Sequence, residues 1–146
     1  ISGQLFIRRA DMQYSNNLIT RLIEFINEDD SLSSLGKAIR AYDTRGLPVP
    51  INETYFSFSC QENSTSYSLD EENVIVAESK VIIKMSCFSP LKKSAYSAHS
   101  LTERIIGAIC SKFAGSISGF TIGETQYDDD VKSYKITGKI SFTFPS

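Results

Sequence analysis

Strict alternation of apolar and polar residues over two long segments is the feature that most constrains the fold of this chain. In residues 133–144, "SYKITGKISFTF", every second side chain is aliphatic, aromatic or glycine, and the residues between them are lysine, threonine or serine. Residues 81–88, "VIIKMSCF", place one apolar set on each face, broken on one side by Lys84 and Ser86. A period of two predicts β-strands, and the polar side of the second segment predicts a sheet with one solvated face.

Two amphipathic helices are available to cover the apolar face of this sheet. Residues 16–27 carry apolar side chains at helical spacing after good N-cap residues. Residues 94–113 carry a longer stripe, with an N-cap expected near Ser94 or Ser97 and Gly115 expected as the residue after the helix. The stripe consists of Ala98, Leu101, Ile105, Ala108, Ile109 and Phe113.

The remaining segments are assigned from weaker patterns. Residues 55–60 alternate and predict a strand, 32–42 predict a second, weaker helix, and 119–127 predict a strand before the last one. The acidic, serine-rich residues 61–73 predict an exposed loop, and a bulge is expected near Glu78. Together these elements predict a single α+β domain over residues 12–146, with a mainly antiparallel sheet flanked by two principal helices. Because Met12 is the first methionine, we expect residues 1–11 to be an N-terminal extension.

Composition and charge exclude several functional classes. The chain has 146 residues, 41% of them hydrophobic, and a net charge of -2, so no global field favours nucleic acid or an anionic membrane. No apolar run approaches the ~20 residues that span a bilayer. The cysteines, Cys60, Cys87 and Cys110, lie in apolar periodic segments without metal-ligand spacing, which favours buried free thiols in a reducing compartment.

The densest group of carboxylates is "YDDD", with Glu124 a few residues before Asp128, Asp129 and Asp130. Neighbouring residues on a strand point to opposite faces, and a calcium loop places its ligands at alternate positions around a glycine. We therefore interpret the aspartates as the turn between the last two strands. A divalent-metal site that uses Glu124 and Asp128–Asp130 is the less favoured alternative.

No other motif points to catalysis. His99, the single histidine, is expected to be exposed or structural, and the three glycines of residues 115–123 follow a helix, whereas a dinucleotide fingerprint follows a strand. The basic residues fall in pairs separated by acids, which gives little support to a nucleic-acid-binding face. From the residues alone we expect no catalytic residue, no cofactor and no metal, and a protein that assembles with partners.

The order of elements from residue 55 onward resembles the tail terminator (tail completion) proteins of tailed bacteriophages and of phage-tail-like bacteriocins. The resemblance is carried by "YFSFSC", an acidic excursion, a long strand ending in "MSCFSP", the helix in "AHSLTERIIGAICSKF" and the closing "GETQYDDDVKSYKITGKISFTF". With the N-terminal helix, it covers nearly all of residues 12–144.

This resemblance implies a structural protein of a virion tail or tail-like particle, assembled in the bacterial cytoplasm. Six copies would form a ring that caps the tail tube, ends its polymerisation and offers a docking surface to the neck or head connector, or that caps a headless particle. Partners would be the tail tube protein and, in a contractile tail, the sheath protein, with DNA at most passing through the lumen and no membrane. The candidate contacts are Glu62, Asp70, Glu71, Glu72, Lys135 and Lys139. The alternatives are a neck or head–tail connector ring and, less favoured, the metal-dependent enzyme.

Overall fold

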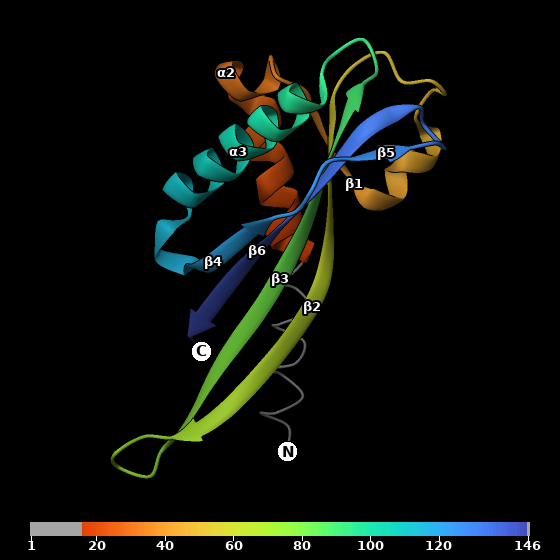
Figure 1. Ribbon diagram of the computed structural model, residues 1–146. Coiled ribbons are helices and arrows are strands. Elements are labelled where there is room, and N and C mark those ends of the chain that lie inside the picture. The colour runs from red at the N-terminus through yellow and green to blue at the C-terminus, as the bar shows by residue number, and fades with distance from the viewer. Residues whose placement is uncertain (1–15, 146) are drawn as a thin grey trace.

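The protein is a mixed α+β chain built around one six-stranded sheet (Figure 1). The computed structural model describes residues 16–145, so the expected extension at residues 1–11 lies outside the described residues. The strands are β1 (Lys37–Arg40), β2 (Tyr55–Leu69), β3 (Ile75–Pro90), β4 (Ile117–Ile122), β5 (Gln126–Asp128) and β6 (Ser133–Pro145). Their order is β1-β2-β3-β6-β4, with β5 also paired to β6, and only β1 and β2 are parallel. The expected α+β class with a mainly antiparallel sheet is confirmed.

Two long helices pack on one face of the sheet. The chain is helical over residues 16–28, and α3 spans Ala95–Lys112. The side chain of Ser94 caps α3 by accepting a hydrogen bond from the backbone N–H of Ser97 at 3.2 Å, as one of the two expected caps would. The expectation for Gly115 is wrong, because α3 ends at Lys112 with Phe113 as its C-cap, and Gly115 lies inside a 3₁₀ turn, η2 (Ala114–Ser116), without a positive φ.

The hydrophobic core lies between these helices and the sheet. It contains the predicted apolar face of β3, namely Val81, Ile83, Met85 and Cys87, and the predicted apolar face of β6 through Ile136, Ile140 and Phe142. The helices contribute Leu18, Ile19, Leu22 and Ile26 on one side and Ala98, Ile105, Ile106 and Ile109 on the other. The apolar side chains that alternate along the strands and those at helical spacing therefore pack in one cluster. This packing decides which face of the sheet is buried.

The second, weaker helix predicted over residues 32–42 is mostly absent. A single turn, α2 (Asp30–Ser33), is capped by the side chain of Asp29, and the chain then enters β1 and a 3₁₀ segment, η1 (Ala41–Gly46). The amide of Asn27 explains the strand, because it donates to the carbonyl of Ala38 at 3.0 Å and accepts from the N–H of Ala38 at 3.0 Å. Asn27, on the N-terminal helix, thus supplies hydrogen-bond partners to the backbone at the outer edge of β1. Local spacing in the sequence does not reveal such a long-range contact.

The loop predicted over residues 61–73 is also mostly wrong. β2 continues to Leu69 and pairs with β3 residue by residue, so only residues 70–74 form the turn. The bulge lies between Cys60 and Glu62 on β2, and no register shift interrupts β3 at Glu78. The polar composition reflects exposure, because the described side chains of this hairpin end are mostly solvent-exposed although the backbone is fully paired.

Gly36 is required where β1 enters the sheet. A Cβ at this position would lie 2.8 Å from the ring of Phe56 and 2.8 Å from the carbonyl oxygen of Thr54, and the Phe56 ring is fully buried. We expect Gly36→Ala to lower the free energy of unfolding by about 1–3 kcal/mol, because neither neighbour can move into solvent. Urea denaturation measures this. The matched control is Gly107→Ala on the exposed side of α3, where nothing lies within 4 Å and a gain of up to ~1 kcal/mol is expected. Equal stability of Gly36→Ala and the unmodified chain would contradict this packing.

Candidate assembly surfaces

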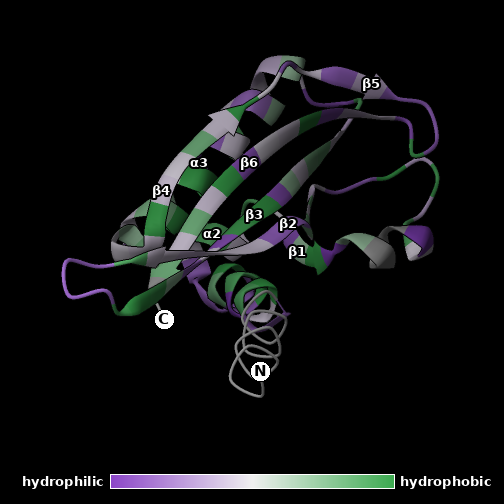
Figure 2. Cartoon of the chain, turned by 90° about the horizontal axis from the view of Figure 1, so that it is seen from below, coloured by the Kyte–Doolittle hydropathy of each residue, from purple (hydrophilic) through white to green (hydrophobic). Residues whose placement is uncertain are grey.

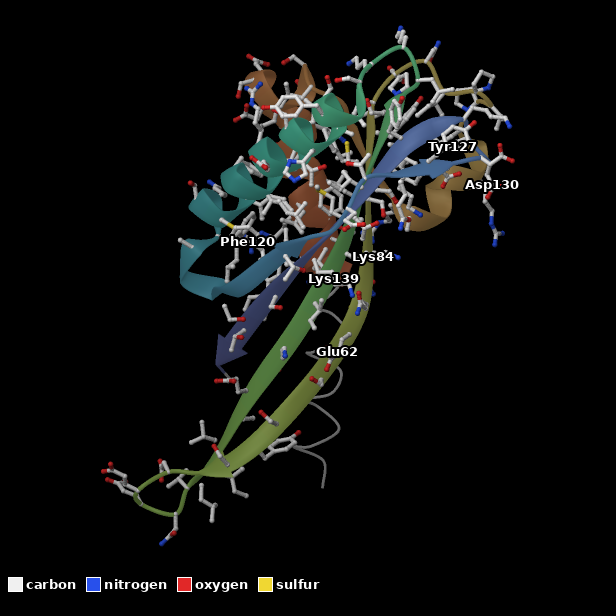
Figure 3. All side chains as sticks on the ribbon, in the orientation of Figure 1. Glu62, Lys84, Phe120, Tyr127, Asp130 and Lys139 are labelled. Atoms are coloured by element: carbon white, nitrogen blue, oxygen red, sulfur yellow. The ribbon has the colours of Figure 1, made fainter. Side chains whose placement is uncertain are left out.

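The face of β3 and β6 opposite the two long helices carries polar side chains, and we call it the open face. Its central row is Ser59 on β2, Lys84 on β3, Lys139 on β6 and Thr121 on β4, all directly opposed in register. Figure 3 shows Lys84 and Lys139 beside each other near the middle of the sheet. The prediction that Lys139 lies on a polar, solvated face is therefore confirmed.

Lys84 and Lys139 are a directly opposed pair of like charges. Within residues 16–145 neither ammonium group has an ion-pair partner, and neither does Lys80, further along the same face of β3. Opposed like charges on neighbouring strands destabilise a sheet. Lys139 was a predicted contact and Lys84 was not, although the alternation in "VIIKMSCF" already places Lys84 on the face opposite Val81, Ile83, Met85 and Cys87. Only the register shows that the two lysines face each other.

The other end of the open face is covered by the chain itself. Ile51, Tyr55 and Phe88 form a second small cluster there, with Leu47 and Val131 packed against it. Lys135, another candidate contact, belongs to this end: its Nζ lies 5.4 Å from the centre of the Phe88 ring and 3.9 Å from an oxygen of Asp128. Lys135 is thus engaged within the monomer and is a weaker contact candidate than Lys139.

The hairpin of β2 and β3 projects beyond the rest of the sheet (Figure 1). β1 ends opposite Phe58, and β6 ends opposite Glu78. We call residues 67–77 the arm, because among the described residues no strand pairs with the hairpin there on either side. Its turn is closed by Asp70, whose side chain accepts hydrogen bonds from the N–H groups of Glu72 and Val74, each at 2.9 Å. Asp70 is therefore a structural residue of the turn.

The tip of the arm combines acidic and apolar side chains. Glu71 and Glu72 are exposed in the turn, and their carboxylates form no ion pair within the described residues. Beside them Leu69 is 64% exposed, Val74 54% and Ile75 70%. Figure 2 shows this hydrophilic turn at the end of the strands with hydrophobic residues next to it. Glu62, the remaining candidate contact, lies on β2 opposite Ile82, between the tip and the lysine row (Figure 3). The exposure of Leu69 was missed because residues 61–73 were interpreted as a loop, and that of Val74 and Ile75 because the strand pattern does not show that the hairpin extends beyond its neighbouring strands.

Asp128, Asp129 and Asp130 form the turn into β6, which confirms the preferred prediction. One oxygen of Asp128 accepts hydrogen bonds from the N–H groups of Asp130, at 3.0 Å, and Val131, at 3.4 Å. Asp129 pairs with Lys132 at 2.6 Å, and this hydrogen bond raises the pKa of the Lys132 ammonium. Glu124 is exposed between β4 and β5. Residues 16–145 contain no group of three or more metal-ligating side chains, so the structure does not gather these four carboxylates.

The single histidine and the cysteines have structural surroundings. His99 lies near the start of α3, with its Nδ1 2.8 Å from a carboxylate oxygen of Glu103. Burial raises the pKa of all three thiols, to about 11 for Cys87, so none is activated as a thiolate. Cys87 is buried as predicted, whereas Cys60 is exposed because it adjoins the bulge of β2.

Comparison with known proteins leaves the family of this chain open. The chain matches no protein-family model, and no curated protein matches its sequence. Among residues 16–145, no helix is both long enough and apolar enough to cross a lipid bilayer.

Replacing Asp128 separates a turn from a metal site. We expect Asp128→Ala to lower the free energy of unfolding by about 1 kcal/mol, because two backbone N–H groups lose their acceptor. Asp128→Asn/Asp129→Asn/Asp130→Asn keeps that acceptor and should unfold at nearly the same urea concentration as the unmodified chain. Calorimetric titration with calcium, magnesium and manganese gives the second readout. A micromolar site that the triple substitution removes would contradict the turn interpretation.

Removing one lysine of the opposed pair should stabilise the monomer. We expect Lys139→Thr to raise the free energy of unfolding by less than ~1 kcal/mol, with a larger gain at low salt than at high salt. Lys80→Thr is the matched control, because Lys80 faces Thr143 across the strands and not a second lysine. Equal gains in both variants would show that strand propensity, and not repulsion between Lys84 and Lys139, sets the effect.

Proposed function

We propose that this chain is a structural subunit of a phage tail or tail-like particle, in which six copies form a ring that caps the tail tube. The observation that carries the proposal is the arm, with its exposed apolar tip. Solvent-exposed apolar side chains gathered at one place are typical of a surface that contacts another protein. The resemblance of residues 12–144 to tail terminator proteins supplies the particular assembly.

The distribution of uncovered surfaces supports an assembly role. A ring subunit needs two different surfaces that fit each other around the ring, and a further surface for the tube. The open face and the arm lie at different places on the sheet, and neither is covered by the two long helices. Six copies related by a six-fold axis would each offer an arm and an open face to their neighbours, and the ring as a whole would sit on the six-fold tube. Each single contact can then be weak, because docking on the tube raises the effective concentration of neighbouring copies.

The decisive experiment is imaging of particles made without this chain. We expect tails that overgrow or fail to join heads, because nothing ends the tube, while the tube protein itself remains able to assemble. Tails of normal length that join heads normally, or headless particles that remain fully functional, would contradict the proposal.

A variant without the arm tests the observation that carries it. Replacing residues 67–77 by Asn-Gly joins Ser66 to Glu78, which face each other in register, through a turn suited to a hairpin. We expect this variant to fold, because the core cluster contains no residue of the arm, but not to restore normal tails. Circular dichroism and thermal unfolding check the fold, and Gly107→Ala is the control that should fold and restore normal tails. Full restoration by the armless variant would show that the arm has no part in capping.

A further inference from the structure

The chain carries two surfaces of opposite charge that lie far apart. Glu71 and Glu72 lie at the tip of the arm, and Lys84 and Lys139 lie in the middle of the open face. Each of the four charges lacks an ion-pair partner within residues 16–145. At ~3.3 Å per residue, the stretch of β3 from Lys84 to Ile75 is about 30 Å long.

These two surfaces cannot meet within one molecule. The hairpin is paired continuously from Leu69–Ile75 at the tip to Tyr55–Phe88, apart from the one bulge after Cys60. A fully paired hairpin does not fold back through 30 Å onto its own sheet without breaking its backbone hydrogen bonds. Charges that match but cannot meet within the chain fit a contact between two copies.

We infer that the arm tip of one copy docks on the open face of the next copy, with Glu71 and Glu72 beside Lys84 and Lys139. The contact is head-to-tail, because it uses two different surfaces of the same chain, and such contacts close into a ring when the rotation allows it. This inference rests on the proposed ring and names its contact. It also accounts for the opposed lysines, whose repulsion within the monomer is relieved by two carboxylates from a neighbour.

Apolar side chains complete the match between the two surfaces. Ile82 is half-buried on the open face, on the same strand as Lys84 and nearer the arm. Val74 and Ile75 at the tip are more than half exposed and lie next to the acidic turn. A nucleic acid would satisfy the lysines but would leave the apolar tip and its carboxylates unused, so a second copy fits more of the observed surface.

Charge exchange between the two surfaces tests this contact. The first variant, Glu71→Lys/Glu72→Lys, has lysines on both surfaces, and the second, Lys84→Glu/Lys139→Glu, has glutamates on both. Association of the full chain is measured by sedimentation equilibrium at low salt, up to about 1 mM protein. We expect each variant alone to associate at least ~10-fold more weakly than the unmodified chain, because like charges then meet. An equimolar mixture of the two should associate again, because each tip then finds a face of opposite charge.

A third variant controls for the overall charge. Glu24→Lys/Glu28→Lys changes the net charge as much as the first variant does, but on the exposed surface of the N-terminal helix. It should associate like the unmodified chain. Mixed with Lys84→Glu/Lys139→Glu, it should associate no more strongly than the unmodified chain does in the same mixture.

Three results would overturn the inference. These are an unmodified chain that stays monomeric under these conditions, a reversal of either surface without effect, and a mixture that fails to associate. A DNA fragment added as a probe gives a fourth: binding lost in Lys84→Glu/Lys139→Glu, with self-association unchanged in Glu71→Lys/Glu72→Lys, would mark the open face as a polyanion surface.

If the mixture associates but particle imaging finds no effect on tails, the contact stands and the proposed function fails. If imaging confirms the cap but the reversals have no effect, the ring closes through another contact.

Discussion

Burial of one row of apolar side chains on β3 and β6 beneath two helices is the constraint on which the rest of the structure depends. Alternate residues of the middle of β3, from Val81 to Cys87, and of β6, namely Ile136, Ile140 and Phe142, enter the core cluster, and the residues between them lie on the other face. Since the helices supply apolar stripes for one face only, the part of the opposite face that the chain leaves uncovered must carry mainly side chains that tolerate water. The position of the lysine row follows directly from the position of the core.

The arm follows from a difference in length between strands and helices. The 18 residues of α3 extend about 27 Å at 1.5 Å per residue, whereas the 16 residues of β3 extend about 53 Å at 3.3 Å per residue. β3 is therefore longer than the helix that packs on it, and the part of the strand beyond the helix has fewer core side chains to contact. The backbone there remains satisfied by pairing between β2 and β3, so the segment stays a strand although its side chains are mostly exposed.

Some charged side chains form contacts within the monomer, whereas others remain available to partners. Asp70 and Asp128 close turns, Asp129 pairs with Lys132, and Lys135 lies over an aromatic ring. Glu71, Glu72, Lys84 and Lys139 have no such role within the described residues. In a chain whose net charge is only -2, local separation of unpaired charge, and not an overall field, offers the means of selecting a partner.

The sequence by itself determined the α+β class, the buried faces of β3 and β6, the helix after Ser94 and the turn at Asp128–Asp130, because each depends on spacing or turn chemistry within one segment. Tertiary structure alone decided that residues 37–40 form a strand, since the amide of Asn27 and the edge of β2 supply its hydrogen bonds. It also decided that residues 61–69 are paired, since their partners lie across the turn on β3. Tertiary structure alone also decided that Lys84 and Lys139 face each other. Parity assigns a residue to a face, but only the register between strands distant in sequence brings two particular side chains together.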